Sequence, residues 1–159
     1  MNAIKIELKW AFLFTIMSLA WIFLEKVTGL HDKHIEYHPY FTMLFFIPAV
    51  VFYVLAIMER KKKFYKSHFK YKNAFISGLI LTLIITLLAP LGQYISVEYI
   101  SPEYFENAIQ ASVENGYYKT EAEARANFNT SNYMLQSTIF ALVSGIITTL
   151  IVSIFVRSK

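Results

Sequence analysis

The sequence contains no cysteine among its 159 residues. A disulfide framework, thiol catalysis and a cysteine-ligated metal site are therefore excluded. Charge is also scarce, since Asp, Glu, Lys and Arg make up 16% of the chain, against about 25% in soluble domains. Hydrophobic residues reach 56%, which exceeds the roughly 45–50% of soluble domains. The missing charge indicates a membrane protein.

The hydrophobic excess is concentrated in four apolar runs, at 10–24, 40–58, 74–97 and 133–156. A spanning helix needs about 20 apolar residues. The first run is shorter, but flanking lysines can lengthen it by reaching toward the headgroups. The basic start and Ser18-Leu19-Ala20 also resemble a signal peptide, although the apolar run continues to Leu24. We predict an all-α integral membrane four-helix bundle, one domain over 1–159, with spans at 10–27, 40–58, 74–97 and 133–156.

Basic and acidic residues alternate between the two sides of these spans. Of the 15 Lys and Arg residues, 11 lie in the N-terminal flank, the 59–73 connection and the C-terminus. Nine of the 11 acidic residues lie between residues 25 and 39 or in the 98–132 connection. Because cytoplasmic loops carry the basic excess, both termini and loop 59–73 are expected in the cytoplasm. Loops 28–39 and 98–132 are expected outside a bacterial inner membrane.

The 98–132 connection carries helix signals. Ser101-Pro102-Glu103 is typical of a helix start, and Gly116 of a helix end. Thr120–Glu123 has the spacing of a capping box and predicts a second short helix. Thr130 or Ser131 is expected to cap the last span. The first of these helices is amphipathic, with one face formed by Phe105, Ala108, Ile109, Ser112 and Val113.

Small residues recur every four positions in the last two spans. Such faces let membrane helices approach closely. We favour packing within one subunit, and the alternative is an oligomer or partner interface. The candidate packing residues are Gly78, Thr82, Thr86, Ser137, Ala141, Gly145 and Thr149.

Three histidines, His31, His34 and His38, lie three and four residues apart in the first outer loop. If that segment were helical, their imidazoles would share a face and could bind zinc or copper. A pH-responsive cluster is a second possibility, and we favour a third, a polar turn without metal or cofactor. Glu25, at the membrane edge, could pair with Lys26 or His31 and is expected to be a structural polar anchor.

The inner loop interleaves cations with aromatic side chains. Near an anionic leaflet each cation contributes about 1 kcal/mol, although topology alone already requires a basic loop here. Nucleic-acid binding is not expected, because the loop is short and held at both ends. The candidate anionic-lipid residues are Arg60, Lys61, Lys62, Lys63 and Lys66.

Several strings carry a family resemblance. They are Trp21-x-x-Leu24-Glu25-Lys26-x-x-Gly29-Leu30-His31-Asp32-Lys33, Phe75–Leu79, Pro90-Leu91-x-Gln93-Tyr94, Ser101–Phe105 and Gln136-Ser137-Thr138. Together they resemble an uncharacterised bacterial family of small four-span membrane proteins, a domain of unknown function, over almost the whole chain. The resemblance implies the four-span architecture and no activity, so it assigns no functional residue.

The sequence carries no catalytic signature, since no nucleophile is presented with a base and an oxyanion site. No Asp, Glu, Lys, Arg or His lies deep inside a predicted span, which argues against proton-coupled transport. We expect a non-enzymatic accessory or interaction subunit, in contact with the bilayer and with another membrane or extracytoplasmic protein. The alternative is a small homo-oligomeric transporter or channel lined by the small-residue faces. A third hypothesis is a metal-dependent protein using the three histidines.

Overall fold

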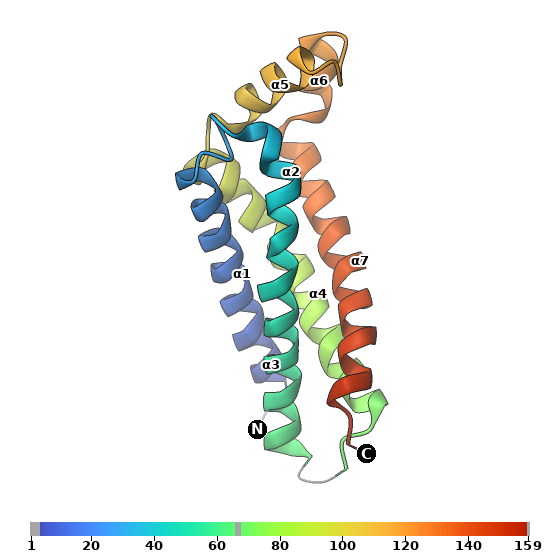
Figure 1. Ribbon diagram of the computed structural model, residues 1–159. Coiled ribbons are helices and arrows are strands. Elements are labelled where there is room, and N and C mark those ends of the chain that lie inside the picture. The colour runs from blue at the N-terminus through green and yellow to red at the C-terminus, as the bar shows by residue number, and fades with distance from the viewer. Residues whose placement is uncertain (1–3, 66–67, 159) are drawn as a thin grey trace.

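The computed structural model describes residues 4–65 and 68–158, and within them it is all-helical with no strand. Four helical segments are long and apolar enough to cross a membrane, at Ile4–Val27, Ile35–Phe64, Tyr71–Ile100 and Thr130–Val156. The predicted all-α, four-span fold is therefore confirmed. Figure 1 shows an elongated bundle with both termini at one end, here called the terminal end. The opposite end, which carries α5 and α6, is called the loop end.

The elements follow one another in a simple order along the bundle. The long helices are α1 (Ile4–Val27), α3 (Phe46–Phe64), α4 (Tyr71–Ile95) and α7 (Thr130–Val156). Short helical pieces precede α3, namely η1 (Ile35–Tyr37), α2 (His38–Phe41) and η2 (Thr42–Phe45). A π-helical turn, η3 (Ser96–Ile100), ends the third span, and α5 (Tyr104–Glu114) and α6 (Glu121–Asn127) follow it.

The long helices extend beyond most of the predicted span limits, because they continue into polar and charged residues. At the terminal end, Glu7 of α1 is fully buried. Arg60 Nη1 donates to its two carboxylate oxygens at 2.8 and 3.0 Å, and Ser77 Oγ donates to Oε1 at 2.6 Å. Apolar runs alone miss this contact, which joins α1, α3 and α4.

Helices α4 and α7 pack closely along their small residues. A Cβ added at Gly78 would lie 2.5 Å from Thr149 Cγ2, and one at Gly145 would lie 2.6 Å from Thr82 Cγ2. Thr82 and Thr149 are fully buried, with their hydroxyls 3.3 Å apart. The structure thus places these four predicted residues in contacts between helices of one chain.

The predicted loop helices lie across the loop end (Figure 1). Helix α5 buries Ala108, Ile109 and Ser112, all on its predicted apolar face. Helix α6 begins at the predicted capping box, where the Thr120 hydroxyl accepts from Glu123 N. Two caps differ from the sequence expectation: α5 begins after Glu103 without a side-chain cap, and α7 is capped by Asn129.

Candidate metal centre

A tight turn at the end of α1 places His31 over Glu25. Leu30 N donates to Glu25 O at 2.9 Å, and Gly29 N donates to Lys26 O at 3.0 Å. This is the Schellman pattern, which needs a left-handed residue after the helix. Gly29 provides it, with φ +80°. The chain therefore reverses within two residues of the helix end.

The second imidazole comes from the start of α2. His38 is the first residue of this short helix, and Pro39 follows it in the first turn. Proline suits that position because its missing N–H has no partner there and its φ is already helical. The apolar helix α3 continues from this segment, so His38 is fixed to a membrane-spanning element.

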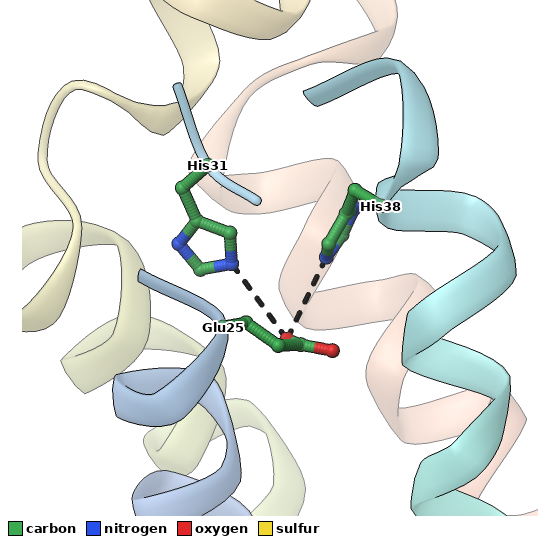
Figure 2. A group of neighbouring side chains, drawn as sticks. All are labelled: Glu25, His31 and His38. Atoms are coloured by element: carbon green, nitrogen blue, oxygen red, sulfur yellow. Dashed lines mark ion pairs between the residues drawn. The ribbon is translucent and has the colours of Figure 1, made fainter. Parts of the chain in front are cut away.

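Figure 2 shows the His31 and His38 rings side by side, both directed at the Glu25 carboxylate. His31 Nε2 and His38 Nε2 each lie 3.6 Å from the same oxygen, Glu25 Oε2. One donor atom from each of the three residues fits within a 4.8 Å group. A distance of 3.6 Å is longer than an ordinary hydrogen bond, but it lies within ion-pair range when an imidazole is protonated.

The outward-facing ring nitrogens do have partners, and both come from the α5 segment. His31 Nδ1 lies 2.9 Å from Ser101 Oγ, and His38 Nδ1 lies 3.4 Å from Tyr104 Oη. Asn107 Nδ2 donates to the His31 carbonyl at 2.9 Å. The contacts with Ser101 and Tyr104 are both made by Nδ1, so Nε2 is the nitrogen of each ring that faces Glu25. Metal binding through Nε2 requires the tautomer that carries its hydrogen on Nδ1.

The group is largely shielded from solvent. Glu25 and His31 are 4% and 6% exposed. The other carboxylate oxygen, Glu25 Oε1, accepts from Trp21 Nε1 at 2.8 Å. A buried carboxylate needs compensating partners, and here one oxygen has a hydrogen bond while the other is surrounded by imidazole nitrogens.

The donor atoms fit a transition-metal ion. At metal–donor distances of about 2.0–2.2 Å, tetrahedral ligands are about 3.4 Å apart, close to the 3.6 Å spacing between carboxylate and imidazole. Imidazoles that bind metal usually donate their other N–H to a neighbouring oxygen, and Ser101 and Tyr104 offer such oxygens. Three protein ligands leave a fourth position open.

The structure brings together two of the three predicted histidines. His34 is exposed and lies outside the group that joins His31 and His38. The reason is that residues 31–34 form a turn and helical structure starts only at Ile35, so spacing of three and four does not align the rings. Sequence reasoning named His31 as a possible partner of Glu25, and the structure places the two side chains together, but it did not group Glu25 with both His31 and His38. It also missed Ser101 as a partner of His31.

Most predicted anionic-lipid residues make contacts within the protein. Arg60 pairs with Glu7, Lys61 Nζ donates to Val156 O at 2.7 Å, and Lys63 pairs with Glu59 at 2.7 Å. Lys62 has no side-chain hydrogen bond or ion pair to another described residue. Lys66 lies outside the described residues.

The remaining predicted packing residues lie apart from the Gly78–Thr149 contact. Ser137 and Ala141 line a partly open cavity between the long helices. The Thr86 hydroxyl is buried and has no hydrogen-bond partner among the described residues. The cavity lies next to the Glu25, His31 and His38 group, whose three side chains form part of its wall.

Comparison with known proteins gives a family but no functional precedent. No curated protein and no solved structure matches the chain. A family model described as "Protein of unknown function (DUF4199)" matches residues 9–158. The chain, a multi-pass protein by its four spans, therefore belongs to the DUF4199 family.

Proposed function

We propose that the protein binds a divalent transition-metal ion at the loop end of its transmembrane bundle, through Glu25, His31 and His38. The proposal rests chiefly on one observation. Both imidazoles turn Nδ1 toward an oxygen of the α5 segment and Nε2 toward one carboxylate oxygen, at 3.6 Å in each case. This arrangement leaves the space that a cation would fill.

The donor set limits the kind of ion. Two imidazoles and one carboxylate suit zinc and non-haem iron, whereas calcium and magnesium prefer oxygen ligands. The proposed role is binding rather than catalysis, in keeping with a sequence that carries no catalytic signature.

The charge pattern supports a location for this site. Both termini lie at the terminal end (Figure 1), where α3 ends in Lys61, Lys62 and Lys63. By the positive-inside rule, we infer that the terminal end faces the cytoplasm. The protein would then lie in a bacterial inner membrane, with the metal site near the outer face of that membrane. A metal site there is compatible with the accessory-subunit hypothesis and with the transporter alternative, and both remain predictions.

Metal binding can be measured directly on the full chain. Purified protein in lipid nanodiscs would be stripped of metal and titrated with Zn²⁺ against a chromogenic chelator. Wild type should bind one equivalent. Loss of a residue that hydrogen-bonds a metal ligand typically lowers metal affinity 10–100-fold. The Zn²⁺ affinity should fall by more than this when a ligand itself is changed, as in Glu25→Gln, His31→Ala and His38→Ala. Ser101→Ala should fall within about that range.

His34→Ala is the matched control, because it removes an imidazole from the same loop but not from the group. It should bind Zn²⁺ like wild type. Thermal melts of the metal-free variants would show that each is folded. Unchanged affinity in His31→Ala and His38→Ala, or an equal loss in His34→Ala, would refute the site.

A further inference from the structure

The cavity beside the metal-site residues has a volume of about 300 Å³. It lies among α1, α3, α4 and α7, and its middle is bounded by apolar side chains such as Ile22, Phe45, Ala49 and Ala141. Edge-on aromatic contacts join the helices around it, between Phe14 and Phe45 and between Phe46 and Phe140. Small-molecule sites in proteins begin at about this volume and are mostly apolar.

Polarity is distributed unevenly along the cavity. At the loop end it is lined by the metal-site residues and by Gln93 and Ser96. Neither of these last two side chains has a hydrogen bond to another described residue. Toward the middle of the bundle the polar lining includes Tyr53, whose hydroxyl is already bonded to Thr82 at 3.0 Å. The cavity therefore suits a molecule with one polar end and an apolar body.

The charge of the metal site determines which polar group the ligand should carry. A divalent ion held by one carboxylate and two neutral imidazoles retains one unit of positive charge. Glu25 is the only carboxylate among the residues that line the cavity. Because an uncompensated charge is costly in a buried site, the open fourth position favours an anionic ligand such as a carboxylate.

The cavity also has a neighbour on the lipid-facing side. Trp21 and Glu25 belong both to its wall and to the wall of an apolar groove between α1 and α2, which Leu24, Phe41 and Leu44 also line. These three side chains are about half exposed. The groove and the cavity therefore adjoin at Trp21 and Glu25.

We propose that the cavity binds an alkyl carboxylate of about eight carbons, whose carboxylate completes the metal coordination while its chain lies among the four long helices. The volume sets the scale of the length, because 300 Å³ holds on the order of ten groups the size of a water molecule, at roughly 30 Å³ each. This inference rests on the proposed metal site. It adds the class of ligand that the site receives.

The visible spectrum of bound Co²⁺ can distinguish the contribution of the ligand's carboxylate from that of its alkyl chain. Wild-type protein in phosphatidylcholine nanodiscs would be loaded with Co²⁺, whose visible spectrum reports its ligands. Octanoate should change that spectrum at lower concentration than acetate does, because only octanoate fills the apolar cavity. Octan-1-ol and octylammonium should leave the spectrum unchanged, since neither brings an anionic ligand.

Cavity-filling substitutions test where the chain lies. Ala141→Phe should retain Co²⁺ and the acetate response and should weaken the octanoate response at least tenfold. Val143→Phe is the matched control, because Val143 lies on the same helix but is 51% exposed and outside the cavity wall. If Ala141→Phe does not fold, Ala49→Phe places a ring in the same cavity from α3.

Each outcome has a distinct meaning. Loss of the octanoate response in Ala141→Phe but not in Val143→Phe supports the inference. Failure of wild type to bind Co²⁺ refutes the metal site itself. Binding of Co²⁺ with equal responses to octanoate and acetate leaves the metal site standing and overturns the alkyl carboxylate. An equal response to octan-1-ol or octylammonium overturns the anionic head.

Discussion

Ser101 shows how a long-range contact can displace a local one. A serine before a proline is typical of a helix N-cap, and a cap contributes about 1 kcal/mol. Here α5 begins at Tyr104, and the buried Ser101 hydroxyl lies 2.9 Å from His31 Nδ1. Leaving a buried imidazole nitrogen unsatisfied costs about 1–3 kcal/mol. The contact with His31 is therefore worth at least as much as the cap it replaces.

The pair of Glu106 and Arg125 gives a pH prediction for the contact of α5 with α6. Hydrogen bonds and attraction from Arg125 hold the pKa of Glu106 below its ordinary value of 4.5. A lowered pKa stabilises the contact above that ordinary value, and the stabilisation is lost as pH falls through the folded pKa. Hydrogen exchange of α6, corrected for intrinsic rates, should therefore accelerate as pH falls below about 4.5.

Glu106→Gln should show the faster exchange at neutral pH as well, because the amide lacks the charge that Arg125 pairs with. Glu114→Gln is the control, since Gln110, on the same helix, is the hydrogen-bond partner of Glu114 among the described residues. An identical pH profile in wild type and Glu106→Gln would contradict the assignment. The side chains are exposed, so high salt should reduce the effect.

The elements were predictable from the sequence to different degrees. Long apolar runs fix the number and order of the spans, because a helix in lipid must satisfy its own backbone. Helix ends were less predictable. The described part of α1 starts at Ile4, six residues before Trp10, and includes Glu7, which pairs with Arg60; sequence alone gives no sign of a partner 53 residues away.

Only part of the candidate site could be predicted from the sequence, because its contacts also join residues that are far apart in the chain. His31 and His38 were candidates by residue type and spacing. Their contact with Glu25 depends on the turn at Gly29 and on α5 lying over the loop end. A helix over residues 32–38 would have grouped His34 with them. The observed backbone leaves His34 outside the group. Backbone reversal and tertiary docking, not residue type, decide which side chains form this group.

Two glycines of α4 should respond oppositely to the same substitution. Gly78→Ala puts a Cβ 2.5 Å from Thr149 Cγ2, whereas Gly92→Ala meets nothing closer than Thr15 at 3.9 Å. Overpacking costs about 1–3 kcal/mol, while replacing a helical glycine without a clash gains up to about 1 kcal/mol. Thermal melts in mild detergent should show a lower Tm for Gly78→Ala and an unchanged or higher Tm for Gly92→Ala. A Gly78→Ala protein as stable as wild type would show that α4 and α7 do not pack this closely.

At the scale of the whole molecule, polar contacts hold both ends of an otherwise apolar bundle. Glu7 joins three helices at the terminal end. At the loop end Glu25 joins α1 to His38 of α2, and its other partner, His31, contacts Ser101 before α5. Apolar packing between membrane helices lacks the hydrophobic drive that it has in water. The relative positions of the helices therefore depend heavily on these two contacts.

Loss of Glu7 should destabilise the bundle more than loss of any surface charge. Glu7→Ala removes the carboxylate that Arg60 and Ser77 contact, and breaking a buried ion pair from one side typically costs about 3–5 kcal/mol. Arg60→Met in the same chain should recover part of that loss, because the buried cation is then removed too. Unfolding in a denaturing detergent would measure both. Lys5→Ala, at an exposed position, should have little effect, and an equally mild Glu7→Ala would refute the role.

The two buried carboxylates of α1 also set its rotational phase. Glu7 and Glu25 are 18 residues apart, which is five turns at 3.6 residues per turn, so both face the interior about 27 Å apart. Inserting one residue between them would rotate one carboxylate by about 100° toward lipid. Family members that keep both acids should therefore keep this spacing, whatever else varies along the helix. The length of α1 between these two acids therefore fixes the separation and the relative rotation of the two ends of the protein.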